Sequence, residues 1–228
     1  MTESLLRARS LRKAFGRTEA LRGATIDVER GEVVAVTGPS GSGKSTLLLC
    51  LAGILRPEAG EIIYDDRRLD RLSESERTKL RRRHFGLVLQ FGQLVPELPA
   101  VENVALPLLL DGHPRRDAEG AARAWLERLG ADQLATALPG ELSGGEAQRV
   151  AVARALVAGP SVVFADEPTG ALDTVSSEEV LGVLLSAARD TDATVVLVTH
   201  DNRVAASADR EVVLRDGAVV PVPAELRP

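Results

Sequence analysis

Short runs of apolar, mostly β-branched residues recur along the chain and alternate with stretches of helical periodicity. Four of these runs have the length and composition of buried strands, at residues 33–37, 85–89, 162–167 and 193–199. Helical patterns cover residues 45–55, 71–83 and 176–189. Because parallel strands are joined by helical crossovers, this alternation predicts an α/β fold with a core of mostly parallel strands.

Further strand-forming runs gather in the N-terminal part of the chain. Runs at 5–11, 24–28 and 61–64 are separated by turn-like segments such as 15–18 and 29–31, and they predict a β-rich layer beside the parallel core. Near the other end, residues 210–220 have the pattern of a hairpin that turns around Asp216 and Gly217.

The apolar spacing becomes helical from residue 101 to about residue 156, and prolines punctuate this segment. Within it, residues 121–129 form an amphipathic pattern and residues 147–157 a second helical one. We therefore expect one domain over residues 1–228, in which residues 91–156 are an inserted helical subdomain. Residues 1–90 and 157–228 would form the β subdomain and the ligand-binding core.

The composition narrows the possible functions. Hydrophobic residues make up 44% of the chain, enough for a substantial core. Aromatic residues make up only 3%, which leaves little surface for base stacking, and the formal net charge of −5 disfavours binding along a polyanion. We expect no nucleic-acid partner. Cys50, the single cysteine, excludes an intrachain disulfide and fits a small core residue.

Two features bear on the cellular compartment. The N-terminal residues are interrupted by charges and lack the apolar centre of a signal peptide. No apolar run approaches the ~18 residues needed to cross a bilayer. We therefore expect a cytosolic chain whose membrane role, if it has one, comes through a partner.

Residues 38–46 match the phosphate-binding loop pattern G-x-x-x-x-G-K-[ST], between a predicted strand and a predicted helix. Its glycines let the backbone turn tightly and bring N–H groups to phosphate oxygens at the positive end of the helix. Lys44 would neutralise the β- and γ-phosphates, and Ser45 would ligate the Mg²⁺ that bridges them. The predicted nucleotide-binding residues are Gly38, Ser40, Gly41, Ser42, Gly43, Lys44, Ser45 and Thr46.

Polar side chains also follow three of the predicted buried strands. Asp166 and Glu167 end an apolar run that needs no carboxylate for packing; Asp166 would hold Mg²⁺ through water, and Glu167 would orient or deprotonate the attacking water. Gln90 and His200 end two other strands, where open α/β sheets bind ligands. His200 would donate a hydrogen bond to a γ-phosphate oxygen.

Three further positions each admit two interpretations. Ser143, Gly144 and Gly145 would expose N–H groups at a helix start as a second phosphate-contacting surface, yet Ser143 with Glu146 is also an ordinary capping box. Phe15 either stacks on adenine or packs in the fold. Asp173 either caps the helix that follows it or communicates across an interface.

The ordered set of motifs resembles the nucleotide-binding domain of ATP-binding-cassette (ABC) proteins over nearly the whole chain. Residues 38–46 are similar to the Walker A loop of the family, and residues 162–166 are similar to its Walker B strand, with Glu167 in the place of the catalytic glutamate. Residues 142–146 are similar to the LSGGE signature. Three single residues are similar to further motifs: Gln90 to the Q-loop, Asp173 to the D-loop and His200 to the switch histidine. Phe15 falls where the family commonly has a tyrosine that stacks on adenine.

The resemblance implies an α/β P-loop NTPase with a RecA-like core, an N-terminal antiparallel β subdomain and an inserted α-helical subdomain. It implies ATP and Mg²⁺ as ligands, with the metal held by Ser45, Asp166 and Gln90. Such domains work as head-to-tail dimers, in which Ser143 and Gly145 of one copy close on ATP held by Lys44 and Ser45 of the other.

The resemblance also implies a membrane partner and a branch of the family. An integral-membrane permease on a separate chain would hold this protein at the cytoplasmic face of the cell membrane, and Gln90 would link the site to it. Residues 94–104 and 168–173 are similar to the branch of macrolide exporters, lipoprotein-release complexes and FtsE-type cell-division ATPases. Two departures are Ala147, a position that is often Gln in this branch, and Phe15 in place of Tyr.

We therefore expect an ATPase subunit that drives export or extraction. The alternative is a mechanotransmission ATPase that regulates an extracytoplasmic hydrolase without transport. The branch disfavours an importer subunit. A soluble cassette ATPase of DNA repair or translation is disfavoured because the chain shows no coiled-coil insertion, zinc module or second cassette.

Overall fold

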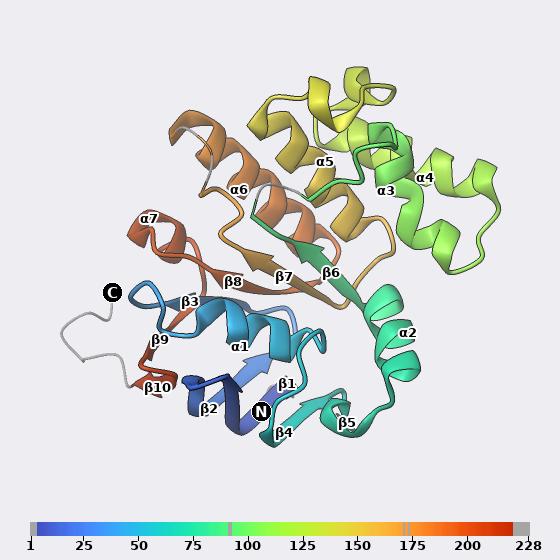
Figure 1. The fold of residues 1–228 in the computed structure, drawn as a ribbon. Coiled ribbons are helices and arrows are strands. Elements are labelled where there is room, and N and C mark those ends of the chain that lie inside the picture. The colour runs from blue at the N-terminus through green and yellow to red at the C-terminus, as the bar shows by residue number, and fades with distance from the viewer. Residues whose placement is uncertain (1–3, 91–92, 171, 173, 221–228) are drawn as a thin grey trace. The chain divides into compact units, whose positions relative to one another are not determined.

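The structure is a computed structural model in which residues 4–90, 93–170, 172 and 174–220 are described (Figure 1). The chain divides into two compact units. Unit 1 contains the residues up to Lys79 and those from Thr194 onwards, and unit 2 contains residues 80–193. Helix α2 (Glu74–His84) includes the point at which the chain passes from unit 1 to unit 2.

Unit 1 contains a four-stranded antiparallel sheet with the order β2-β1-β4-β5 (Figure 1). Its strands are β1 (Ser4–Phe15), β2 (Thr18–Glu29), β4 (Ala59–Tyr64) and β5 (Arg67–Arg68), and the 3-10 turn η1 (Leu69–Arg71) follows. β1 and β2 run longer than the apolar pattern predicts, because their polar ends pair through the backbone up to Phe15 and Thr18. Gly16, at a φ of +60°, closes this hairpin.

A second group of strands in unit 1 surrounds β3 (Val33–Thr37). β3 pairs in parallel with β8 (Thr194–Val198) and with β9 (Arg210–Arg215), and β9 pairs antiparallel with β10 (Ala218–Val220). β3 and β8 are buried along their whole length, as their uninterrupted apolar sequences predict. The predicted hairpin at 210–220 is therefore confirmed.

Helix α1 (Lys44–Leu51) begins at the end of the phosphate loop and contacts β1, β2 and β8. The prediction that this helix continues to residue 55 was wrong. Gly53 takes a φ of +66° and donates to the Cys50 carbonyl at 2.9 Å, while the N–H of Ile54 donates to the Leu49 carbonyl at 2.9 Å. This glycine C-cap ends the helix although the apolar run continues beyond it. The short helix α7 (Asn202–Ala205) packs against β3.

Unit 2 contains the parallel pair β6 (Phe85–Val88) and β7 (Val162–Asp166) and a group of helices. The helices are α3 (Ala100–Leu110), α4 (Arg115–Arg128), α5 (Gly144–Leu156) and α6 (Thr174–Asp190), with the 3-10 turns η2 (Asp132–Leu134) and η3 (Pro139–Glu141) before α5. α5 contacts β6 and the other three helices (Figure 1).

The strand pair of unit 2 packs closely on α5. A Cβ on Gly86 of β6 would lie 2.4 Å from the Ala155 carbonyl oxygen of α5, so only glycine permits this approach. Beside it, the rings of Phe85 and Phe164 meet edge to face with their centroids 5.1 Å apart, and Phe164 is fully buried.

These elements confirm the predicted α/β class, with an antiparallel N-terminal sheet and mostly parallel pairing elsewhere. The assignment of residues 91–156 as a separate helical subdomain stays a prediction. Across the described ranges, no helix combines the length and the apolar character that a membrane span requires.

Candidate functional site

The predicted phosphate loop lies in unit 1, between the end of β3 and the start of α1. Lys44 is the first residue of α1 and is only 8% exposed. Its ammonium Nζ donates to the carbonyl oxygens of Gly38 and Pro39, each at 2.9 Å. Within the described ranges Lys44 forms no ion pair, so its charge faces only neutral acceptors of its own loop. A buried cation in this condition favours binding of an anion.

Two glycines of the loop sit where no side chain fits. Gly38 has a φ of +138°, and a Cβ on it would lie 2.0 Å from the Leu214 carbonyl oxygen. Gly43 has a φ of +100°, and its Cβ would lie 2.2 Å from the Ala20 carbonyl oxygen. The loop is thus pressed against β9 and β2, and its shape depends on glycine at both positions.

Gly41, by contrast, has a φ of +76°, and a Cβ on it would meet no atom within 4 Å. The face of the loop at Gly41 is therefore open, as a phosphate group would require. Next to it, the Ser42 hydroxyl is buried and makes no hydrogen bond within the described residues. An orphaned donor beside a buried ammonium fits the oxygens of a bound phosphate.

The remaining loop residues differ in exposure. Ser40 is exposed, and Ser45 and Thr46 lie in the first turn of α1, where Ser45 is exposed and Thr46 is half-buried. Ser45 therefore presents its hydroxyl at the N-terminal end of the helix. Binding of an anion by the loop's backbone N–H groups, the Lys44 ammonium and the hydroxyls stays a prediction.

Two more predicted residues belong to unit 1. Phe15 ends β1 and is 51% exposed, with the Lys13 ammonium 5.5 Å from its ring centroid. The ring therefore does not belong to the core, and its stacking on adenine stays a prediction. His200 follows β8 and is exposed, just before Asp201, whose side chain caps α7 by accepting from the Arg203 N–H at 2.8 Å.

The carboxylates and the glutamine lie in unit 2. Asp166 is the last residue of β7, and Glu167 directly after it has a φ of +47°, a left-handed conformation that is costly for a residue with a Cβ. Gln90 follows β6, the parallel neighbour of β7. The structure brings Gln90 and Glu167 together at Gly170, where a Cβ would lie 3.4 Å both from Gln90 Nε2 and from Glu167 Cβ.

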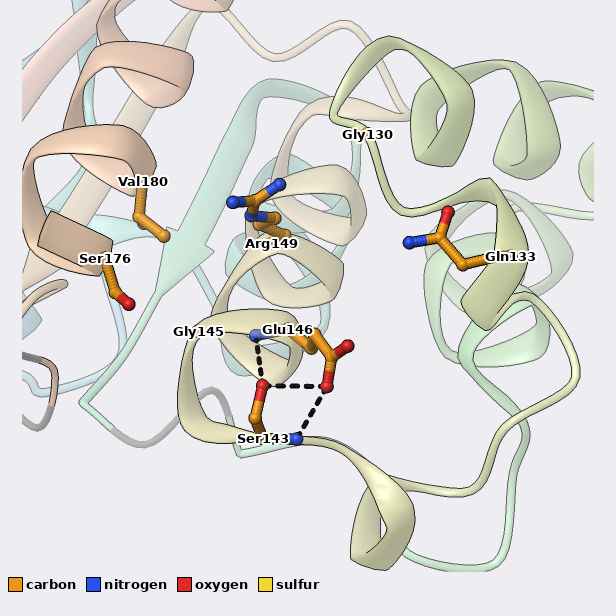
Figure 2. Close-up of a pocket in the computed structure, with 8 residues that line it drawn as sticks. All are labelled: Gly130, Gln133, Ser143, Gly145, Glu146, Arg149, Ser176 and Val180. Atoms are coloured by element: carbon orange, nitrogen blue, oxygen red, sulfur yellow. Dashed lines mark hydrogen bonds between the residues drawn. The ribbon is translucent and has the colours of Figure 1, made fainter.

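The residues 143–146 form the start of α5 and close on themselves (Figure 2). The backbone N–H and the hydroxyl of Ser143 donate to Glu146 Oε2 at 2.8 and 2.7 Å, and the Glu146 N–H donates to Ser143 Oγ at 3.4 Å. The capping box is therefore present. The N–H groups of Gly144 and Gly145 lie in the first turn of the helix, where no carbonyl of the helix itself can accept from them.

A polar cavity of about 180 Å³ adjoins this helix start (Figure 2). Ser143, Gly145, Glu146 and Arg149 line it from α5, together with Gly130, Gln133, Ser176 and Val180. The Arg149 guanidinium also pairs with Glu179 at 2.6 Å. The N-terminal end of α5 is thus accessible, with a cation one turn further along.

Asp173, the remaining predicted residue, lies outside the described residues. Sequence reasoning missed Gly170, although it stands in the segment 168–173 that points to the branch of the family. It also missed Asn103, which is fully buried and holds the segment after Gln90. The Asn103 amide accepts from the Val95 N–H at 2.7 Å and donates to the carbonyls of Val95, Leu98 and Pro99 at 3.1, 2.7 and 3.4 Å.

Comparison with known proteins agrees with this geometry. Residues 21–170 match the family described as ABC transporter. The lipoprotein-releasing system ATP-binding protein LolD of Porphyromonas gingivalis is 41% identical over 213 residues, which cover 93% of this chain and 97% of that protein. LolD 2 of Caulobacter vibrioides is 44% identical over 222 residues, covering 95% and 97% of the two chains.

Solved structures give the same result. The dimeric ATP-binding cassette MJ0796 in a post-hydrolysis state, bound to ADP and Pi, superposes with a TM-score of 0.88 at 36% identity, covering 95% of this chain and 97% of that one. The LolD relatives also confirm the predicted branch. On the strength of the family match, the curated relatives and the shared fold, the chain belongs to the ABC transporter family and is an ATP-binding, ATP-hydrolysing cassette of that family.

Proposed function

We propose that this cassette binds Mg²⁺-ATP on residues 38–46 and uses its hydrolysis to drive a membrane permease that extracts or exports lipid-anchored proteins. The observation that carries the site is Lys44, a buried ammonium that the described residues supply with neutral carbonyls alone. Binding of a triphosphate would give this charge an anionic partner and give the orphaned Ser42 hydroxyl an acceptor.

The chain's own residues would perform distinct parts of the reaction. The loop N–H groups and Lys44 hold the β- and γ-phosphates in place, and the exposed Ser45 hydroxyl faces the same anion. Glu167 orients the attacking water and takes its proton, while His200 donates to a γ-phosphate oxygen. The Gln90 amide, beside Glu167 at Gly170, would report the state of the γ-phosphate to the segment that Asn103 holds.

Magnesium fits the oxygen donors of Ser45, Asp166 and Gln90, and when bound it would neutralise charge on the phosphate oxygens. Among the described residues no three His, Cys, Asp or Glu side chains cluster closely enough to hold a metal ion by themselves. Phosphate oxygens and water would therefore supply most of the coordination, as is usual for this ion.

We further propose that two copies close head to tail on ATP. Ser143, Gly144 and Gly145 present donors at the start of α5, and a γ-phosphate held by the partner's loop would complete them. The dimeric cassettes of known structure support this arrangement. Phe15 would stack on the adenine, and Asp173 would lie at the interface.

The LolD relatives support an integral-membrane partner on a separate chain, which would place this protein at the cytoplasmic face of the membrane. Lipoprotein release is a transfer out of a bilayer, so the cargo class would be proteins that carry acyl chains. The relatives do not favour the alternative of a mechanotransmission ATPase that regulates an extracytoplasmic hydrolase.

The Glu167→Gln variant tests this function. It removes the proton acceptor and keeps the shape, so turnover should fall by about 10² to 10⁴ while ATP binding persists. Light scattering on a sizing column should then show a dimer in ATP and a monomer in ADP. Glu127→Gln, a neutralised exposed carboxylate on α4, is the matched control and should keep wild-type turnover.

Turnover of Glu167→Gln within a few fold of wild type would contradict the role of Glu167, and a monomer in saturating ATP would contradict the dimer. The same variant, tagged and purified from gently solubilised membranes in ATP, should carry a polytopic membrane protein with it. Recovery of soluble partners alone would contradict the transporter assignment.

A further inference from the structure

The carboxylate of Glu146 occupies both donors of Ser143 at the start of α5 (Figure 2). Ser143 gives both its N–H and its hydroxyl proton to Glu146 Oε2, at 2.8 and 2.7 Å. These two hydrogen bonds are the main reason why the pKa of Glu146 lies below its ordinary value. The helix start therefore already holds an anion, supplied by its own third residue.

The same capping box occurs at the start of α2, where it serves as a reference. There Ser73 donates through its N–H and its hydroxyl to Glu76 Oε2 at 2.8 and 2.6 Å, and the Glu76 N–H returns to Ser73 Oγ at 3.3 Å. The hydrogen bonds match those of α5 within about a tenth of an ångström. The box alone is thus an ordinary helix start.

The two boxes differ in the residues that they enclose. In α2 these are Glu74 and Ser75, and the Glu74 carboxylate pairs with the Arg77 guanidinium of the same helix. In α5 they are Gly144 and Gly145, which place no side chain over the N–H groups of the first turn, and Gly145 lines the polar cavity. The first turn of α5 is therefore free of the side chains that the first turn of α2 carries.

We propose that Glu146 is a positioning residue that acts as an internal competitor of the γ-phosphate, holding Ser143 closed until the partner copy's ATP displaces it. This inference rests on the proposed ATP-bridged dimer. Closure of the dimer then has two costs at this point. The Ser143 hydroxyl must turn from the Glu146 carboxylate to the phosphate, and two negative charges must approach each other.

A glutamine at position 146 removes both costs and keeps the cap. Its amide oxygen can still accept from the Ser143 N–H, and it carries no charge. Its NH₂ can also donate to Ser143 Oγ, which frees the hydroxyl proton for the anion. In the Glu167→Gln background, Glu146→Gln should therefore tighten the ATP-dependent dimer by about threefold to tenfold.

The experiment measures the dimer dissociation constant in saturating Mg²⁺-ATP by sedimentation velocity, for Glu167→Gln with and without Glu146→Gln. The affinity of the dilute monomer for a fluorescent ATP analogue should stay the same, since the monomer's own nucleotide contacts residues 38–46. Glu76→Gln, which neutralises the matched box on α2, should leave the dimer constant unchanged. If Glu146→Gln acted only through helix capping or net charge, Glu76→Gln would change the dimer dissociation constant too.

The Ser143→Ala variant tests whether Glu146 acts through the Ser143 hydroxyl. If Glu146 acts through the serine, the gain from Glu146→Gln should shrink in the Ser143→Ala background to the part that comes from charge repulsion. A dimer constant unchanged or weakened by Glu146→Gln, with circular dichroism unchanged, would overturn the inference, and so would a gain that persists in full without Ser143. Failure of Glu167→Gln itself to dimerise in ATP would instead overturn the proposed dimer, so the two failures are distinguishable.

Discussion

Replacing Gly43 by alanine should damage both the stability of unit 1 and its affinity for ATP. Gly43 is the N-cap of α1 and has a φ of +100°, which costs a residue with a Cβ about 1–2 kcal/mol. The new Cβ would also lie 2.2 Å from the Ala20 carbonyl oxygen and 3.3 Å from Leu21 Cδ2. Because the first neighbour is backbone, β2 or the loop must shift by about 1 Å, at a further cost of about 1–3 kcal/mol.

These two contributions predict that the free energy of unfolding falls by about 2–5 kcal/mol. The assay is urea unfolding followed by circular dichroism, together with titration of a fluorescent ATP analogue below the unfolding transition. ATP affinity should fall by at least about tenfold, because the shift moves the N–H groups that precede Lys44.

Two controls separate the clash from the backbone strain. Gly41→Ala (φ of +76°) and Gly16→Ala (φ of +60°) each place a Cβ with nothing within 4 Å, so each should cost only about 1–2 kcal/mol. Gly16 lies in the β1–β2 hairpin directly after Phe15, so its variant serves as a control for stability alone. If Gly43→Ala were no less stable than Gly41→Ala, the close approach of the loop to β2 would be refuted.

Two further predictions concern buried polar groups. Asn103→Ala removes hydrogen bonds from partly buried backbone groups, so it should lower the free energy of unfolding by about 2–4 kcal/mol and speed amide exchange at Val95. Asn103→Asp keeps the acceptor for the Val95 N–H, so it should retain slow exchange at Val95. Exchange at Val95 that is equally slow in Asn103→Ala would contradict this. Burial raises the pKa of the Cys50 thiol to about 11, so the unfolded chain loses this proton first as the pH rises. The contribution of Cys50 to stability should therefore be fully present below about pH 8 and decline by about 2–3 kcal/mol between about pH 9 and 11, a decline that Cys50→Ala should lack in urea unfolding at each pH.

The fold was predictable where burial dominates the sequence. β3 and β8 are buried at every residue, and their continuous apolar runs located them correctly. The apolar pattern did not locate the ends of elements that are set by backbone pairing or by a single glycine. The outer ends of β1 and β2 mix polar and apolar residues and lack a buried alternation, so nothing in their pattern shows that they pair as far as Phe15 and Thr18. Gly53 ends α1 inside an apolar run, against the periodicity of its neighbours.

The candidate site divides in the same way. Residues 38–46 could be located because one continuous segment carries all the groups that hold a phosphate. Gly170 and Asn103 were missed because their roles depend on the fold. Gly170 matters through its approach to Gln90, which lies far earlier in the sequence, and Asn103 through carbonyls that its own helix does not contain. For Ser143 and Glu146, the motif supports the capping box and the anion site equally, since both use the same atoms.

The way in which Asn103 holds its neighbouring loop has an evolutionary consequence. Every hydrogen bond that it makes to Val95, Leu98 and Pro99 goes to a main-chain atom. These bonds do not depend on the identity of the loop's side chains, so residues such as the exposed Pro96 and Glu97 can be exchanged while the bonds are kept. Substitution at these exposed positions should therefore change the surface of the loop while the hydrogen bonds that set its backbone path are kept.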